Sequence, residues 1–252
     1  VVLGWRAPDA LVRLLRARRQ RFCPSLPLSR TLPSPPMHLA HAYTQEGGNA
    51  VDAAVATTLC QGVVNPFASG PGGGHFMLIR LANGSSTFIN AREQAPGAAT
   101  YNMYDGKGQY ASLDGGLAIG IPLELKGLEL AWQRYGRLPW RRLVLPSAQI
   151  AQHGYATPPY MNYVITGNYT FNRLKGDPLM AKSFLIPTPD GGWRPPAVGE
   201  LCCQRPALAA TLTASECLCA RAPFCGGQGA AGHGHVKRCN RSACERGDPA
   251  WD

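Results

Sequence analysis

A stretch of fifty residues, 47–96, constrains the fold more than any other part of this chain. It opens with Asn49, a residue type that caps helix N-termini, and Asp52 follows where the helix dipole favours negative charge. Apolar residues then recur at helical spacing, at Val51, Val55, Leu59 and Val63. We therefore predict a core helix that begins after Asn49 and ends before Pro66, because proline disfavours helical geometry in the residue before it.

A glycine turn and a hairpin are predicted after this helix. Residues 71–74 read PGGG, and residues 75–81 are apolar on both faces apart from Arg80. A strand of this kind is typical of a sheet that is covered on both faces, so we expect it to be buried. Asn83-Gly84 is a strong hairpin signal and predicts a two-residue type I′ turn.

The register of this hairpin decides where its charged residues lie. A two-residue turn pairs Ala82 with Ser85, and counting outward places His75 opposite Arg92. Arg92 then lies beside the glycine turn, where a guanidinium can hold a carboxylate with two parallel hydrogen bonds. Spacing alone leaves an alternative open: a surface ion pair between Arg92 and Glu93 without a function.

Four blocks of the sequence carry a family resemblance. They are GGNAVDAA (47–54), GGG (72–74), NAREQAP (90–96) and GLELAWQRYGRLPW (127–140). In this order they resemble the large-subunit signature of the gamma-glutamyltransferases, also called glutathione hydrolases. Four ordered blocks are more specific than a lone glycine motif. The resemblance is clear from about residue 47 to 155 and weakens toward 212.

The resemblance implies an α+β fold, as one incomplete half of the αββα four-layer sandwich of N-terminal-nucleophile hydrolases. A small subunit of the same precursor would complete it. The resemblance also implies that Arg92 binds the α-carboxylate of glutathione or another γ-glutamyl compound, without a cofactor. The alternative is a non-catalytic binding or regulatory partner derived from the same fold.

The family's nucleophile is a threonine freed by self-cleavage, whose own amino group can act as the base. In the family, this threonine and the oxyanion donors lie in the small subunit. Thr57 and Thr58 match no such site, because they fall inside the predicted helix. We therefore expect no catalytic residue in this chain and no activity from the chain alone.

Composition divides the chain into three parts. Residues 1–38 hold seven Arg against one Asp and a Pro/Ser-rich run, which predicts a disordered leader: a mis-specified or truncated start, or a targeting peptide. Residues 39–212 are expected to form the domain. Most of the formal charge of +10 lies outside residues 39–200, which hold twelve basic against ten acidic residues, so we expect no nucleic-acid partner. The compartment stays open, although the family suggests the secretory pathway, the extracellular space or a membrane.

The third part, residues 213–252, is rich in Cys and Gly and is expected to be disordered or spurious. Seven of the nine cysteines fall between Cys202 and Cys244. The five cysteines from residue 217 onward could ligate zinc together with His233 and His235, but the usual CxxC or HxxxH pairs are missing, so we expect no metal site; the five are Cys217, Cys219, Cys225, Cys239 and Cys244. Cys60, on the predicted core helix, is expected to be a small buried hydrophobe.

The middle of the chain gives weaker signals. Residues 117–121 predict a short buried strand, and Pro122 suits the first turn of a helix that ends at Gly136. Leu123 stands where the family commonly has glycine. Residues 137–154 predict two short helical pieces that are joined at Pro146. A lone histidine such as His75 is more often a packed residue than a base.

Overall fold

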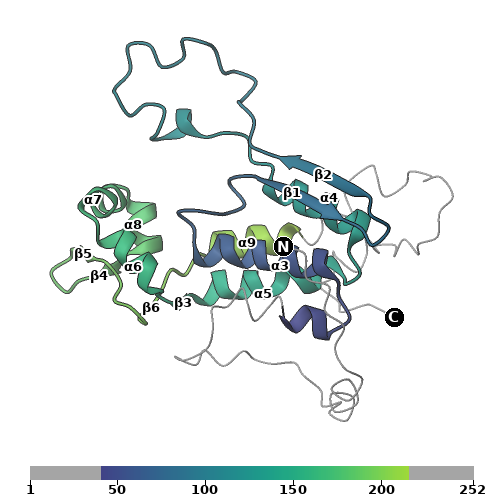
Figure 1. The fold of residues 1–252 in the computed structure, drawn as a ribbon. Helices are drawn as coiled ribbons and strands as arrows, with labels where there is room; N and C mark the ends of the chain where they lie inside the picture. The colour runs from purple at the N-terminus through teal and green to yellow at the C-terminus, as the bar shows by residue number, and fades with distance from the viewer. Residues whose placement is uncertain (1–40, 216–252) are drawn as a thin grey trace.

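The computed structural model describes residues 41–215, so the predicted leader and nearly all of the predicted tail lie outside the described residues. Three helices pack side by side (Figure 1): α3 (Ala50–Val64), α5 (Trp140–His153) and α9 (Pro206–Ser215). Helix α4 (Glu124–Tyr135) contacts both α3 and an antiparallel hairpin, which is formed by β1 (His75–Arg80) and β2 (Ser86–Ala91). The described part is therefore a mixed α and β structure.

A second group of short elements follows α5 in the chain. Its helices are α6 (Pro159–Thr166), α7 (Asn168–Gly176) and α8 (Pro178–Phe184). Two short strand pairs accompany them: β3 (Tyr155–Ala156) with β6 (Leu201–Cys202), and β4 (Ile186–Pro187) with β5 (Trp193–Arg194). Among the described helices, none combines the length and the apolar character that a membrane span requires.

Helix α3 begins where the sequence predicts. The Asn49 side chain accepts hydrogen bonds from the backbone N–H groups of Val51 (2.9 Å) and Asp52 (3.1 Å), and Asp52 accepts one from the Asn49 N–H (2.9 Å). Asp52 is fully buried and also accepts backbone hydrogen bonds from Arg137 (3.0 Å) and Leu138 (3.3 Å). One carboxylate therefore joins the start of α3 to the link between α4 and α5.

The prediction for Cys60 is confirmed. Cys60 is fully buried on α3, and burial raises the pKa of its thiol to about 12. A thiol with so high a pKa is neutral and behaves as an apolar side chain in the core.

The predicted hairpin register is wrong by one residue. His75 pairs with Ala91, and the Leu81 N–H donates to the carbonyl of Ser85 (2.9 Å), so the loop has three residues. A type I′ turn requires positive φ at both central residues, but only Gly84 in this loop has one, at +87°. The Asn83 side chain instead accepts the N–H of Ser85 (3.0 Å), which favours the longer loop.

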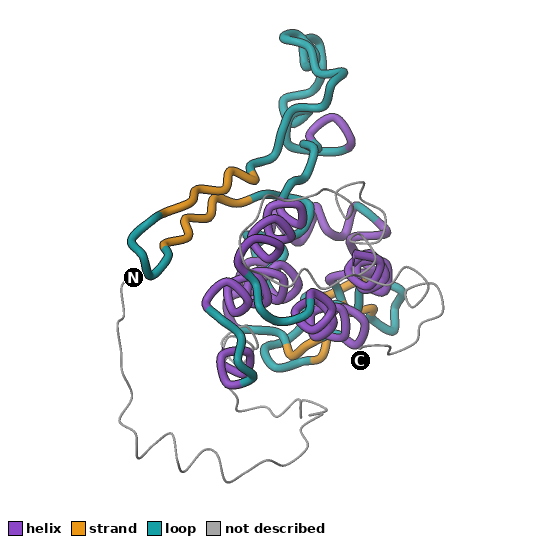
Figure 2. Tube along the Cα trace, turned by 90° about the vertical axis from the view of Figure 1, so that its right-hand side faces the viewer, coloured by secondary structure: helices purple, strands orange, loops and turns teal. Residues whose placement is uncertain are grey.

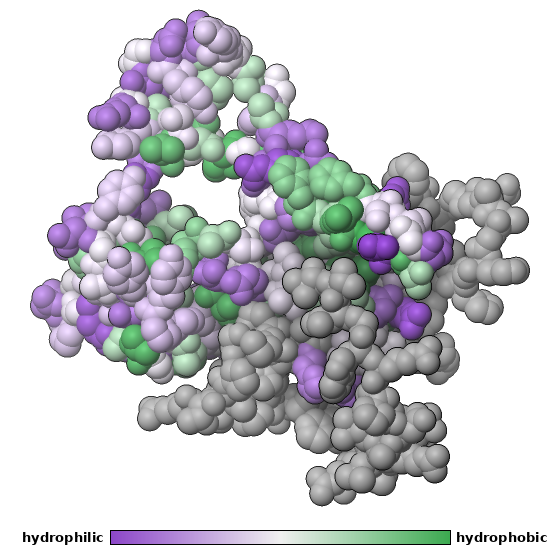
Figure 3. All heavy atoms as spheres, viewed as in Figure 1, coloured by the Kyte–Doolittle hydropathy of each residue, from purple (hydrophilic) through white to green (hydrophobic). Residues whose placement is uncertain are grey.

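One face of the hairpin is covered and the other is open, so the prediction of two covered faces is wrong for the described residues. The covered face carries Ile79, Ile89 and Ala91, which are buried. The open face carries Phe76, Leu78 and Phe88, which are 61%, 72% and 60% exposed. Figure 2 shows the hairpin extending away from the helices, and Figure 3 shows apolar side chains gathered over it.

The buried strand predicted at residues 117–121 is also wrong. Its first two residues belong to the short 3-10 helix η1 (Gly116–Ala118), and Ile121 makes a single bridge with Gln94. Residues 97–121 project away from the helices in both views (Figures 1 and 2), so the apolar side chains of this segment have little to pack against and are exposed.

Helix α4 confirms the expected helix after Pro122 and ends before Gly136, as predicted. Leu123 precedes α4 with φ of −125°, so this position does not require the left-handed geometry that glycine would allow. The departure at Leu123 therefore leaves the local turn intact.

Residues 140–153 form one continuous helix rather than the two pieces that we predicted. Proline normally breaks a helix because it has no N–H to donate to the carbonyl four residues earlier. For Pro146 that carbonyl belongs to Arg142, and the hydroxyl of Tyr43 donates to it instead (2.7 Å). Tyr43 is buried and lies outside the stretch on which the prediction was made. A side chain from a distant segment therefore supplies the hydrogen bond that proline cannot.

This replacement can be tested with a double-mutant cycle. We expect Tyr43→Phe to lower the free energy of unfolding by about 1 kcal/mol, because the partly buried Arg142 carbonyl loses this hydrogen bond. In a Pro146→Ala background, the new N–H reaches the Arg142 carbonyl, and the same change should cost less than about 0.5 kcal/mol. Urea unfolding of the four variants measures both costs. Equal costs in the two backgrounds would show that Tyr43 does not replace the missing donor.

Candidate functional site

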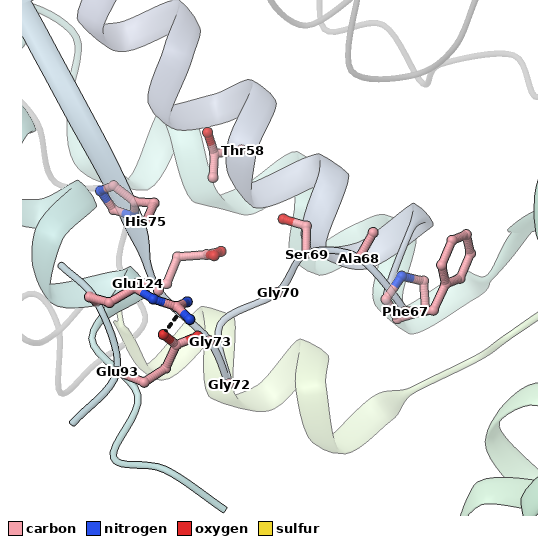
Figure 4. Close-up of a pocket in the computed structure, with 13 residues that line it drawn as sticks. Thr58, Phe67, Ala68, Ser69, Gly70, Gly72, Gly73, His75, Glu93 and Glu124 are labelled. Carbon is pink, nitrogen blue, oxygen red and sulfur yellow. Dashed lines mark ion pairs between the residues drawn. The ribbon is translucent and has the colours of Figure 1, made fainter. Parts of the chain in front are cut away.

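A cavity of about 390 Å³ lies between the C-terminal end of α3, the glycine turn, the base of the hairpin and the first turn of α4. Figure 4 shows His75, Glu93 and Glu124 gathered at one end of it, and Phe67 at the other. The lining residues come from these four segments: Thr58, Pro66, Phe67, Ala68, Ser69, Gly70, Gly72, Gly73, Gly74, His75, Arg92, Glu93 and Glu124. The cavity has the size of a small-molecule site.

The glycine turn is held between two helices. A Cβ atom added to Gly62 of α3 would lie 2.8 Å from the Cα of Gly70, so the turn and the helix approach as only glycines allow. On the other side, the carbonyl of Gly73 accepts the backbone N–H groups of Leu123 and Glu124, each at 3.1 Å. The turn therefore forms a fixed wall of the cavity.

Arg92 follows the last residue of β2 and lines the cavity beside the glycine turn, where the sequence predicts it. Its guanidinium Nη1 lies 2.5 Å from Oε2 of Glu93, and the two side chains are 61% and 28% exposed. The ion pair of the alternative interpretation is therefore present as well. Both features can coexist, because a ligand carboxylate can replace Glu93. The role of Arg92 in binding stays a prediction.

Glu124 is a site residue that the sequence analysis missed. It lies in the first turn of α4, is only 3% exposed, and its Oε1 atom has no hydrogen-bond partner among the described residues. Burial raises the pKa of its carboxyl to about 7; a hydrogen bond from the Gly70 backbone opposes this shift, and the charge of Glu93 adds to it. The sequence shows only an acidic residue at a helix start, where an exposed glutamate is the usual finding.

His75 lies at the same end of the cavity. Both ring nitrogens are buried without a hydrogen-bond partner among the described residues, and burial lowers the pKa of the ring. The ring rests against Gly127 of α4, where an added Cβ would lie 2.8 Å from its Cε1. His75 is therefore a packed, neutral residue at ordinary pH, as expected for a lone histidine.

Within residues 41–215, no group of three or more His, Cys, Asp or Glu side chains is placed to hold a metal ion. The zinc hypothesis concerns residues 217–244, which lie outside the described part. Of the cysteines from Cys202 onward, Cys202 and Cys203 are described, and they form a disulfide with each other.

Comparison with solved structures defines the class of protein. The crystal structure of Helicobacter pylori gamma-glutamyltranspeptidase matches with a TM-score of 0.66 and 32% identity, over 81% of this chain and 56% of that one. The Pseudomonas nitroreducens gamma-glutamyltranspeptidase matches with a TM-score of 0.56 and 32% identity, over 79% and 57%. These neighbours have the N-terminal-nucleophile hydrolase fold.

The family follows from the sequence match. A family model described as gamma-glutamyltranspeptidase matches residues 39–216. The chain therefore belongs to the gamma-glutamyltranspeptidase family, which confirms the resemblance of the four blocks.

Two relatives show how much of the family's length is present. The chain is 43% identical to glutathione hydrolase proenzyme 1 of Schizosaccharomyces pombe, over 66% of this chain and 25% of that protein. It is 38% identical to glutathione hydrolase 2 of Arabidopsis thaliana, over 67% and 28%. The match therefore spans about a quarter of these relatives' length.

The burial of Glu124 predicts a pH-dependent stability. Between pH 4.5 and about 7 the folded chain keeps a proton that the unfolded chain has lost, so stability falls as the pH rises through this window. The rise of the Glu124 pKa from 4.5 to about 7 corresponds to a loss of about 3 kcal/mol in the free energy of unfolding. We expect Glu124→Gln to remove this loss, as measured by urea unfolding at pH 4.5 and pH 7.5.

Glu129→Gln is the matched control, since Glu129 is a second buried carboxyl on α4 that hydrogen-bonds Gln133 (3.1 Å). The control should keep the pH dependence of the wild type. A Glu124→Gln variant whose stability falls with pH as steeply as that of the wild type would contradict the prediction.

Proposed function

We propose that residues 39–212 are the large-subunit portion of a gamma-glutamyltransferase, and that Arg92 binds the α-carboxylate of a γ-glutamyl compound such as glutathione. The observation that carries the proposal is the place of Arg92. Its guanidinium lines a cavity of small-molecule size beside the glycine turn, within a motif that matches the family. The planar fork of arginine suits a carboxylate because it offers two parallel N–H donors.

The ligand would exchange places with a group of the protein. In this structure the Arg92 guanidinium is paired with Glu93. A ligand carboxylate brings the same charge and the same geometry, so it can take over the guanidinium while Glu93, which is partly exposed, turns to water. The exchange costs little electrostatic energy, because one ion pair replaces another.

The nucleophile belongs to another part of the precursor in this proposal. Thr57 and Thr58 lie in the interior of α3, where neither has the free amino group that an N-terminal threonine uses as its base. Several relatives are named as proenzymes, which supports a precursor cut into two subunits. This chain then supplies the carboxylate receptor and scaffold, and it has no hydrolase activity alone.

The open face of the hairpin supports the four-layer sandwich. We propose that a second sheet, from the small subunit, packs on Phe76, Leu78 and Phe88, which form an apolar surface with Phe76 and Phe88 stacked at 5.8 Å between ring centroids. A two-stranded hairpin is marginal by itself, and a second sheet would bury this face.

A substitution on this face tests the sandwich. We expect Leu78→Ala to change the unfolding free energy of the chain alone by less than about 0.5 kcal/mol, because Leu78 is exposed there. In a complete two-subunit enzyme the same change should cost about 2–4 kcal/mol, because the residue becomes buried. Leu113→Ala, on the projecting loop, is the control and should be near neutral in both. A neutral Leu78→Ala in the complete enzyme would rule out the second sheet.

A non-catalytic role is the second candidate. The same open apolar face, and the position of Thr57 and Thr58 inside α3, would suit a chain that binds and regulates an active relative. Co-purification of an intact, active enzyme with this chain would favour this role over the first.

The role of Arg92 predicts a specific kinetic effect. In a complete version of the enzyme, Arg92→Lys should raise KM for a γ-glutamyl donor about tenfold or more, because an ammonium cannot reproduce a bidentate, charge-assisted pair. Steady-state kinetics with the donor varied gives the effect. Arg80→Lys, an exposed arginine at the hairpin tip, should leave KM unchanged. An unaltered donor affinity in Arg92→Lys would remove Arg92 from the site.

A further inference from the structure

Glu124 is held in the cavity by its backbone and by its carboxyl group. Its backbone N–H donates to the carbonyl of Gly73 (3.1 Å), and its carboxyl accepts a hydrogen bond from the backbone of Gly70. The side chain is nearly fully buried, and its Oε1 atom has no partner among the described residues. A buried polar atom that faces a cavity without a partner points to a ligand that would face it. Glu124 cannot leave the cavity without breaking its contacts with the turn.

The charges around this cavity are few. Among its lining residues the ionisable side chains are His75, Arg92, Glu93 and Glu124. Helix α3 and the glycine turn contribute only uncharged residues. Arg92 and Glu93 form an ion pair, and the buried ring of His75 is neutral. A single proton on Glu124 therefore decides whether the side chains that line the cavity sum to zero charge or to one net negative charge.

We propose that Glu124 controls the capture of carboxylate ligands at Arg92: its neutral form admits an anion, and its ionised form repels it. The inference rests on the proposed function of Arg92 and makes the site selective for the ligand's charge as well as its shape. It assigns Glu124 as a specificity-determining residue that acts on the carboxylate end of the ligand.

The physical basis is the repulsion between like charges in a partly desolvated space. A bound carboxylate shares the cavity with Glu93, and an ionised Glu124 adds a second repulsive charge. At separations of about 5–10 Å, and with an effective dielectric constant of about 20, this repulsion weakens binding at least tenfold once Glu124 is fully ionised. Because burial places the pKa of Glu124 near 7, the change falls in the neutral range.

The sign of the effect follows from linkage. Affinity for the anion is highest while Glu124 is protonated, and it falls as the pH rises through about 7. By reciprocity, the bound anion raises the pKa of Glu124, so binding near pH 7 must take up protons. Protonation of His75 would add affinity only at lower pH, because burial lowers the pKa of this ring. The two groups are thus separable by pH.

Titration calorimetry of the full chain with S-methylglutathione tests the inference; this probe carries the γ-glutamyl group and has no thiol to exchange with the disulfide. We expect the dissociation constant of the wild type to rise about three- to tenfold between pH 6 and pH 8. Glu124→Gln keeps an oxygen that can accept the Gly70 hydrogen bond, and its constant should change less than about twofold. Glu129→Gln should behave as the wild type.

A second measurement requires no variant. At pH 7, calorimetry of the wild type in two buffers of different ionisation enthalpy should show proton uptake on binding. The absence of proton uptake, or a Glu124→Gln variant with the wild-type pH profile, would overturn the inference and leave the role of Arg92 standing. Failure of the probe to bind the chain at any pH would overturn the proposed binding role of Arg92, and this inference with it.

Discussion

The buried carboxylate of Asp52 is the interaction on which the rest of the structure depends. It closes the capping box of α3 with Asn49 and also accepts the N–H groups of Arg137 and Leu138, 85 and 86 residues further along. A buried charge is tolerated only when hydrogen bonds satisfy it, and here backbone groups from two segments do so. Helix α3 forms one wall of the cavity and α4 carries Glu124, so this carboxylate holds the two helices together at the ends that lie away from the cavity.

Close backbone packing then places Arg92. A Cβ atom added to Gly74 would lie 2.1 Å from the carbonyl oxygen of Ala91, and one added to Gly127 would lie 2.3 Å from the Ala91 Cβ. The base of the hairpin is thus held by glycines of the turn and of α4. This explains why Arg92 lies where it was expected although the register is wrong by one residue: contacts at the base fix its position, and the loop at the far end does not.

Local signals in the sequence were sufficient for part of the fold and site. Asn49 and the apolar spacing predicted α3, and the motif around Arg92 predicted a charged residue beside the turn. Contacts between residues that lie far apart in the sequence could not be predicted from such local signals. Nothing near Pro146 shows that Tyr43 replaces its missing donor, and nothing near Glu124 shows that α3 and the turn enclose it. The open hairpin face was missed because an apolar strand does not reveal whether its cover lies among the described residues.

Under the proposed function, the ion pair between Arg92 and Glu93 would set a minimum binding free energy that a ligand must supply. An unpaired guanidinium at the edge of a cavity attracts any small anion. A guanidinium that is already paired, as Arg92 is with Glu93, binds a ligand only when the free energy of the new contacts exceeds the free energy lost with the old pair. A carboxylate alone gains little by the exchange, because it replaces an equivalent group. A ligand that also fills the cavity as far as Phe67 adds burial to the exchange. Under the proposed function, selection for a carboxylate on a larger molecule would follow from the pairing of Arg92, and a protonated Glu124 would keep the exchange from meeting a second negative charge.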